Sequence, residues 1–200
     1  MNDRDVLLVV DVQNDFCPGG ALAVPRGDEI VPAANRLARS FAHVVLTQDW
    51  HPLGHSSFAS AHPGKRPFDT VEMPYGTQIL WPDHCVQGTD GAALLAGLDM
   101  PHAELIVRKG FHKTIDSYSA FRENDRRTPT GLGSYLRERG FDHVTLCGLA
   151  TDFCVLYSAL DARAAGFATT VVLEACRGLD VDGSLARALD RMRQAGIELI

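Results

Sequence analysis

The sequence predicts an α/β fold in which a central, mostly parallel sheet lies between two layers of helices, a three-layer α/β/α arrangement. Short apolar runs recur along both halves of the chain, and helical patterns of apolar residues separate them. Glycines stand where several of the helices should end. Strands and helices that alternate in this way form a parallel sheet covered on both faces by right-handed crossover connections.

The carboxyl-terminal half shows this alternation most clearly. Helices are expected over residues 130–139 and 152–165, and a third is expected from the apolar stripe Leu185, Ala188, Leu189 and Met192. A glycine follows each of them, at positions 140, 166 and 196, and each glycine leads into a predicted strand, at 143–149, 169–173 and 197–200. Because glycine can adopt the left-handed conformation that ends a helix, each boundary has a physical cause.

The amino-terminal half repeats the pattern less regularly. Strands are expected at 6–10, 43–47 and 104–108, and a helical stripe consists of Ile30, Ala34, Leu37, Ala38 and Phe41. Residues 50–103 break the pattern, since they are rich in His, Pro, Gly and Trp and have little periodicity. A long irregular segment is unusual in a compact domain, and a bound metal ion would organise it. Without repeats or low-complexity tails, residues 1–200 are expected to form a single domain.

The composition narrows the range of partners and compartments. The 200 residues carry a net charge of −6 without any run of five like charges, so neither nucleic acid nor a membrane is expected as a partner. Only five consecutive apolar residues precede Asp11, too few for a signal peptide or a membrane span. The five cysteines are an odd number without a CxxC pair, which favours free thiols and a cytoplasmic location.

Three reactive side chains fall at the ends of predicted strands, where ligands bind in open parallel sheets: Asp11, Lys109 and Cys154. Each also has an ordinary explanation, since such residues commonly cap a turn, face solvent or pack in the core. Cys154 differs because Thr151 or Asp152 is expected as a helix N-cap, which puts the thiol in the first turn. Unpaired N–H groups and the helix dipole favour a thiolate there. Asp11 is then a candidate base for the thiol proton, and Lys109 a cation that holds the pair.

A second candidate cluster lies in the irregular segment and consists of Asp49, His51, His55 and His84. An Asp-x-His pair at a strand end directs both side chains to the same face. Oxygen and nitrogen donors suit Zn²⁺, Fe²⁺ or Mn²⁺. A chance grouping among the eight histidines explains the spacing equally well, and Cys85 is an alternative ligand.

Five segments, spread in order from residue 9 to residue 155, resemble a known family: VVDVQNDFCPGGALAV, TQDWHP with HSSF, WPDHCVQGT, RKG and GLATDFCV. Together they are similar to the nicotinamidase/pyrazinamidases of the isochorismatase-like (cysteine hydrolase) superfamily. The resemblance implies an isochorismatase-like fold and the hydrolysis of nicotinamide to nicotinate and ammonia, through a cysteine thioester, in NAD salvage. Pyrazinamide is a further candidate substrate, and the chain is expected to be a monomer or a small homo-oligomer.

Transferred residue by residue, the resemblance implies a catalytic triad of Asp11, Lys109 and Cys154. The backbone N–H groups of Ala150 and Cys154 would form the oxyanion hole, beside a cis peptide between Leu149 and Ala150. One divalent ion per chain, zinc first with iron and manganese as alternatives, would be bound by Asp49, His51 and His84. His55 is a fourth ligand in some members and variable in others. The pocket residues implied are Phe16, Trp81, Tyr118 and Phe153, the last of which replaces Tyr or His of relatives.

Three alternatives are weighed against this prediction. An isochorismatase would cleave a vinyl ether and dispenses with the cysteine, so Cys154 argues against it. An N-carbamoylsarcosine-type amidase keeps the triad but lacks the metal cluster that Asp49, His51 and His84 provide. A non-catalytic binding protein with the same fold would not need both the catalytic triad and the metal ligands. The sequence does not predict how the polar insert at 112–131 closes the pocket.

Overall fold

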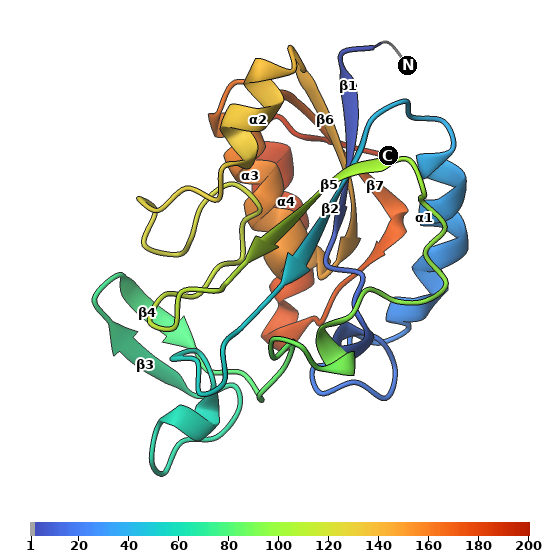
Figure 1. Ribbon diagram of the computed structural model, residues 1–200. Coiled ribbons are helices and arrows are strands. Elements are labelled where there is room, and N and C mark those ends of the chain that lie inside the picture. Colours follow the sequence, from blue (N-terminus) through green and yellow to red (C-terminus); the bar gives the residue numbers. More distant parts are fainter. Residues whose placement is uncertain (1–2) are drawn as a thin grey trace.

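A six-stranded sheet forms the centre of the computed structural model, which describes residues 3–200 (Figure 1). Its strands are β1 (Asp5–Val10), β2 (Val44–Asp49), β5 (Ala103–Lys109), β6 (His143–Leu149), β7 (Ala168–Arg177) and β8 (Glu198–Leu199). They lie in the order β5-β2-β1-β6-β7-β8, and every neighbouring pair is parallel. The parallel sheet that the alternating pattern predicts is therefore confirmed.

Helices cover both faces of this sheet. They are α1 (Val31–Ala38), α2 (Leu132–Glu138), α3 (Leu156–Ala164) and α4 (Ser184–Gln194). Figure 1 shows α1 on one side of the sheet and the other three helices on the opposite side, which gives the three layers. Within residues 3–200, none of the helices has the length and apolar character needed to cross a bilayer.

The strand order creates a switch point in the middle of the sheet. From β1 the chain proceeds to β2 and β5 at one edge, whereas β6, β7 and β8 extend toward the other edge. Crossover connections therefore leave β1 and β6 in opposite directions, and a crevice opens at their carboxyl ends. Val10 is in register with Gly148, and Asp49 is in register with Lys109. Four neighbouring strands thus end at one crevice.

Most predicted boundaries agree with the structure. The glycines at 140, 166 and 196 all have positive φ, as the left-handed helix ends require. Strands β2 and β5 extend to Asp49 and Lys109, so both side chains belong to the last residue of a strand. Strand β7 is longer than predicted, and the helix predicted at 152–165 starts with a single π-helical turn, Thr151–Val155, before α3. Phe41, placed on the first helical stripe, is buried beyond the end of α1.

The segment 50–103 contains a regular element that the sequence pattern missed. Strands β3 (Thr70–Met73) and β4 (Gly76–Ile79) pair as an antiparallel hairpin. Each has four residues, and most of their side chains are exposed or half-buried. Such short strands carry too few apolar positions for an alternation to be recognised.

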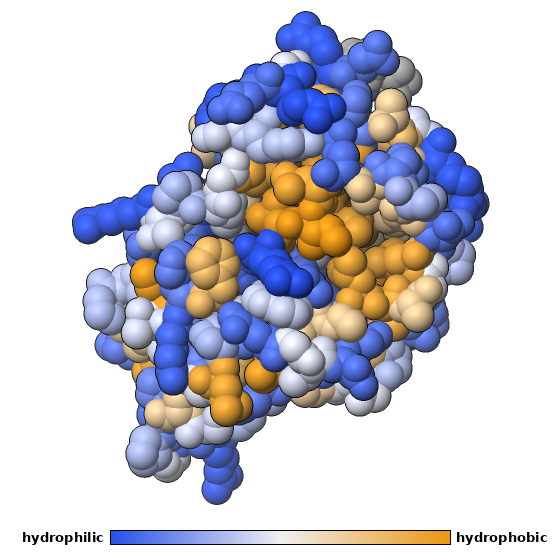
Figure 2. Space-filling view, viewed as in Figure 1, coloured by the Kyte–Doolittle hydropathy of each residue, from blue (hydrophilic) through white to orange (hydrophobic). Residues whose placement is uncertain are grey.

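The edge strand β5 leaves apolar side chains at the surface. Figure 2 shows an apolar area over the region that β5 occupies in Figure 1, with polar atoms around it. Ile106 of this strand is half exposed. Lys109, the last residue of the strand, is buried.

Candidate active site

Asp11 is the first residue after β1, and it is fully buried with a φ of 48°. Thr47 on the neighbouring strand β2 fixes its orientation. The Thr47 hydroxyl donates to Asp11 Oδ1 at 2.5 Å, and the Asp11 backbone N–H donates to Thr47 Oγ1 at 3.0 Å. One carboxylate oxygen is thereby bound, and the other, Oδ2, faces Lys109.

Lys109 connects the reactive groups of the site. Its Nζ lies 2.8 Å from Asp11 Oδ2 and donates to Asp49 Oδ1 at 2.6 Å. It also donates to the Ser117 carbonyl at 2.9 Å and approaches Cys154 Sγ at 3.5 Å. A buried ammonium is stable only with such partners, and complete burial rules out the solvated lysine that the sequence left open.

Cys154 lies in the π-helical turn that follows β6. The peptide between Leu149 and Ala150 is cis, as the resemblance implies. The expected N-cap is wrong, because extended Ala150 takes that position without a side-chain cap. The Asp152 carboxylate instead accepts the N–H groups of Leu179 at 3.0 Å and Asp180 at 2.8 Å, a fold contact beyond the reach of sequence spacing. Cys154 nevertheless lies in the first turn.

Burial controls the protonation of these groups. It raises the pKa of the Cys154 thiol well above its usual value, and Lys109 offsets this only in part. Burial likewise raises the pKa of Asp11, against the effect of Lys109. For Lys109 burial alone would lower the pKa, but Asp11 and Asp49 more than compensate and raise it well above normal. The thiol is therefore neutral at rest and needs a base, and a carboxylate with a raised pKa is a stronger base than usual.

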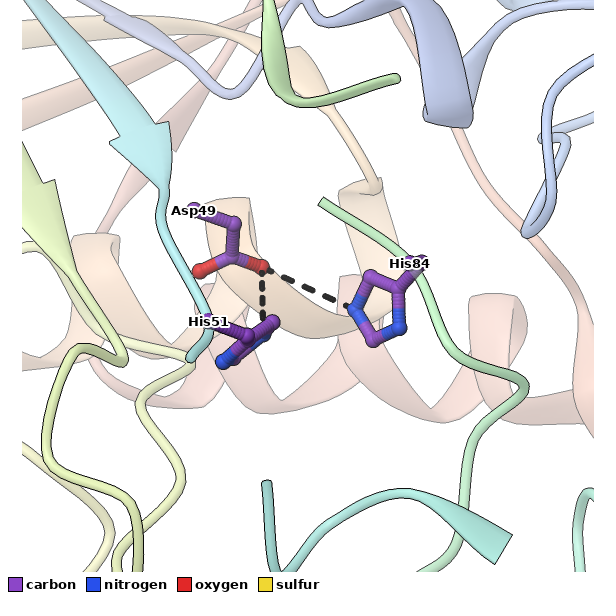
Figure 3. Close-up of side chains that lie close together, drawn as sticks. All are labelled: Asp49, His51 and His84. Atoms are coloured by element: carbon purple, nitrogen blue, oxygen red, sulfur yellow. Dashed lines mark ion pairs between the residues drawn. The ribbon is translucent and has the colours of Figure 1, made fainter. Parts of the chain in front are cut away.

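A second cluster adjoins this unit and consists of Asp49, His51 and His84 (Figure 3). Their donor atoms all lie within 4.8 Å of one another. Asp49 Oδ2 lies 3.6 Å from His51 Nε2 and 4.0 Å from His84 Nε2, whereas its Oδ1 accepts from Lys109. The Asp49 carboxylate is therefore shared between the cluster and the Cys154 side of the pocket.

Backbone carbonyls orient both imidazoles toward Asp49. His51 Nδ1 bonds the Gly110 carbonyl at 2.9 Å, and His84 Nδ1 bonds the Pro82 carbonyl at 2.8 Å, so that both Nε2 atoms point toward Asp49. Within residues 3–200, His51 Nε2 is a buried nitrogen without a hydrogen-bond partner. An orphaned nitrogen beside a carboxylate and a second imidazole fits a divalent metal with oxygen and nitrogen ligands.

Two of the three residues in this cluster have a pKa shifted toward the deprotonated form that binds metal, and His51 is the exception. Burial, aided by His51, lowers the pKa of His84 to about 4, so its imidazole is neutral at neutral pH. Burial would raise the pKa of Asp49, but Lys109 and His51 more than offset it and keep the carboxylate ionised. Burial would lower the pKa of His51, yet Asp49 raises it overall. A metal ion would compete with that proton for His51, because ligands bind in their deprotonated form.

The group of Asp49, His51 and His84 includes neither His55, which belongs to a second possible group with His51 and Asp116, nor Cys85. His55 Nδ1 accepts the Ser57 N–H at 3.2 Å, and its Nε2 donates to the carbonyls of His112 at 2.9 Å and Ile115 at 3.2 Å. Both ring nitrogens are thus used within the protein. Cys85 is in none of the possible ligand groups formed by residues 3–200. Its carbonyl accepts the His51 N–H at 3.0 Å, which is a supporting contact.

The residues assigned to the substrate pocket do gather around the thiol. One pocket is lined by Cys154 and Ala150 together with all four aromatic side chains, Phe16, Trp81, Tyr118 and Phe153. Trp81 and Phe153 contact edge to face, with ring centroids 5.0 Å apart. Asp49 and His84 line the same pocket, so the thiol and two residues of the candidate metal cluster face one cavity.

Comparison with known proteins identifies the family. The isochorismatase domain family matches the chain over residues 5–200. The chain belongs to the isochorismatase family. It is 56% identical to a nicotinamidase of Acinetobacter baylyi over 97% of this chain and 91% of that relative.

Solved structures of family members extend the likeness to three dimensions. A nicotinamidase–pyrazinamidase of Acinetobacter baumanii has 56% identity and a TM-score of 0.99, covering 100% of this chain and 97% of that one. A pyrazinamidase of Pyrococcus horikoshii, solved in complex with zinc, has 36% identity and a TM-score of 0.81, covering 98% of each chain.

Sequence reasoning missed three buried polar residues of this isochorismatase-family site: Gln13, Thr47 and Asp116. Gln13 Oε1 accepts the Asp49 N–H at 2.8 Å, and its Nε2 donates to the Asp49 carbonyl at 2.9 Å. Gln13 thus fixes the backbone of Asp49, a residue of the candidate metal cluster. The signal for Thr47 was present, since it lies two residues before Asp49 on one strand and faces the same side. For Gln13 and Asp116 the spacing offers no such signal.

Proposed function

We propose that this chain is a nicotinamidase, which hydrolyses nicotinamide to nicotinate and ammonia with Cys154 as its nucleophile and supplies nicotinate to NAD salvage. One observation carries the proposal: the Lys109 ammonium contacts Asp11, Asp49 and Cys154 and so joins a nucleophile, a base and a metal-binding carboxylate. The relatives named nicotinamidase support the choice of substrate. Pyrazinamide is proposed as a second substrate, since one of those names includes it.

The first half of the reaction forms a thioester. Asp11 takes the proton of the Cys154 thiol, and the sulfur attacks the carboxamide carbon while Lys109 balances the negative charges. The backbone N–H groups of Ala150 and Cys154 would stabilise the oxyanion, a contact whose loss typically costs about 10²–10³ in rate. Asp11 then gives its proton to the departing nitrogen. The C–N bond breaks and ammonia leaves.

The second half returns the thiol. Asp11, ionised again, takes a proton from water, and the resulting hydroxide attacks the thioester carbon. The C–S bond breaks, the proton held by Asp11 goes to Cys154, and the nicotinic acid formed loses its proton to solvent and leaves as nicotinate. A single carboxylate thus serves as base and acid in both halves. This role suits the raised pKa of Asp11, because its proton must be taken and given at neutral pH.

A bound divalent ion, for which we propose zinc, would supply a Lewis-acid position that accepts the pyridine nitrogen and so orients the ring. Asp49, His51 and His84 would hold it. The zinc complex of the Pyrococcus relative supports that choice. Phe16, Trp81, Tyr118 and Phe153 would flank the ring through their aromatic faces and edges.

Nicotinamide and benzamide distinguish this function from that of a general cysteine amidase. The two amides share ring size and carboxamide chemistry, but benzamide lacks the ring nitrogen. We expect ammonia release from nicotinamide to fall after chelation and to return when Zn²⁺ is added. Benzamide should be a poor substrate throughout. Equal kcat/KM for both amides, or full activity in metal-free protein, would contradict the proposed role of the metal.

A further inference from the structure

Asp116 is a buried carboxylate that has no part in the steps above. It lies after β5 in the polar insert, with 2% of its surface exposed. It lines the same pocket as Asp49, His84 and Cys154. A buried carboxylate is costly unless hydrogen bonds or a cation compensate its charge, so its surroundings indicate what it does.

Asp116 stands next to the metal donors but outside their innermost group. A carboxylate oxygen of Asp116 lies within 4.8 Å of ring nitrogens of His51 and His55, in a second possible ligand group. The group of Asp49, His51 and His84 does not include it. Ligands at about 2.0–2.2 Å from one zinc ion must themselves lie within roughly 4.4 Å of each other. In this arrangement Asp116 therefore does not share one ion with all three of Asp49, His51 and His84.

Two hydrogen bonds hold this carboxylate in place. Gln78 Nε2 donates to Asp116 Oδ2 at 2.7 Å, and the Ser117 backbone N–H donates to Oδ1 at 2.8 Å. Gln78 comes from strand β4 of the hairpin and is itself buried. Since an ionised carboxylate has about four acceptor positions, two remain after these bonds. The neighbouring His55 cannot use them, because its Nε2 proton is bound by the carbonyls of His112 and Ile115.

We propose that Asp116 is an outer carboxylate of the metal centre, which accepts a hydrogen bond from a water molecule bound to the ion. Gln78 is its positioning residue. The inference rests on the metal assigned under the proposed function. The three inner side chains leave coordination positions for water, and Asp116 adds a second buried carboxylate to the pocket that Asp49 lines. Loss of such an outer partner typically weakens metal binding by about 10–100-fold.

The test measures metal affinity instead of turnover. Zn²⁺ and Co²⁺ affinities are determined by competition with a chromophoric chelator, for wild-type protein and for Asp116→Asn. We expect binding to be about 10–100-fold weaker in the variant. The visible absorption of bound Co²⁺ should keep its position and intensity, because the inner ligands remain. Gln78→Leu should weaken binding in the same direction, and to a smaller extent.

Asp161→Asn is the matched control. Asp161 is equally buried on α3 but pairs with Arg126, and its variant should bind metal like wild type. If Asp116→Asn does not fold, Asp116→Ser removes the charge with a smaller side chain and is expected to give the same loss. Affinity within twofold of wild type in Asp116→Asn would overturn the proposal. A changed Co²⁺ spectrum would also overturn it, since it would make Asp116 a direct ligand. Wild-type protein that binds no ion would reject the metal of the proposed function as well.

Discussion

Lys109 contacts two carboxylates and a thiol without exposure to solvent, and burial together with these charges decides which of the groups carries a proton. The sequence places Cys154 at the start of a helix, a position that predicts a lowered thiol pKa. Burial raises the pKa of Cys154 instead. The desolvation of a thiolate in an apolar pocket outweighs the helix end and the single cation. Proton transfer to Asp11 is therefore a required step of the reaction.

The pH dependence of activity should reflect Asp11, which must be ionised to accept the thiol proton. Its pKa lies above the ordinary value, so kcat/KM should fall as the pH drops through that raised pKa. The Thr47 hydroxyl stabilises the ionised form and lowers the pKa. Thr47→Val removes this donor at constant shape, so the acid limb should move to higher pH. The plateau should fall by less than about a hundredfold, as for the loss of the two hydrogen bonds that Thr47 makes with Asp11.

Thr169→Val is the control for this pH profile. Thr169 is buried on β7, and its hydroxyl donates to the Phe167 carbonyl at 3.0 Å, remote from Asp11. Its profile should overlay that of wild type. An unchanged acid limb in Thr47→Val would show that another group limits activity at low pH.

Residues at the ends of strands were predictable, whereas their supporting partners were not. Asp11 and Lys109 follow apolar runs whose strand character is evident from the sequence. Gln13 supports Asp49 from 36 positions away, and Gln78 supports Asp116 from 38 positions away. Such contacts arise from the packing of distant segments, so the local spacing of residues does not predict them.

At the scale of elements, the turn after β5 connects the Lys109 strand to the metal donors. Gly110 has a φ of 67°, and its carbonyl accepts a hydrogen bond from His51. A Cβ at this position would lie 2.5 Å from His51 Cε1. Gly110→Ala should therefore displace the imidazole and weaken Zn²⁺ binding by about tenfold or more, as expected when the orientation of a ligand is lost.

Gly140→Ala separates this collision from backbone strain. Gly140 has a similar φ of 76°, but a Cβ there would meet nothing within 4 Å. Both variants should lose about 1–2 kcal/mol of stability from the left-handed conformation. Only Gly110→Ala should lose metal affinity in the chelator competition. Equal metal affinities in the two variants would contradict the role of this turn.

Helix ends and buried strands were predictable because glycines and apolar runs mark them. The π-helical turn before α3 and the β3–β4 hairpin were not. The first depends on how Ala150 leaves β6 and on how Asp152 bonds the chain before α4. The second consists of four-residue strands with little buried surface.

At the scale of the whole molecule, the strand order brings residues from separate sequence motifs together in one site. Asp11, Asp49, Lys109 and Cys154 come from the ends of β1, β2, β5 and β6, which are neighbours in the sheet. The alternation of strands and helices predicts the layers and the parallel sheet, but it does not specify which strands are adjacent. That order depends on the crossovers, and it places the switch point where the four side chains meet.

Ammonia release from nicotinamide by the purified, Zn²⁺-loaded chain tests the proposed function most directly. Cys154→Ala should abolish release, with a loss of several orders of magnitude, because no other group can form the thioester. Cys147→Ala is the matched control, since Cys147 is equally buried on β6 and takes no part in the reaction. We predict near wild-type release from Cys147→Ala and none above background from Cys154→Ala. Substantial release by a folded Cys154→Ala variant would contradict the mechanism proposed for this chain.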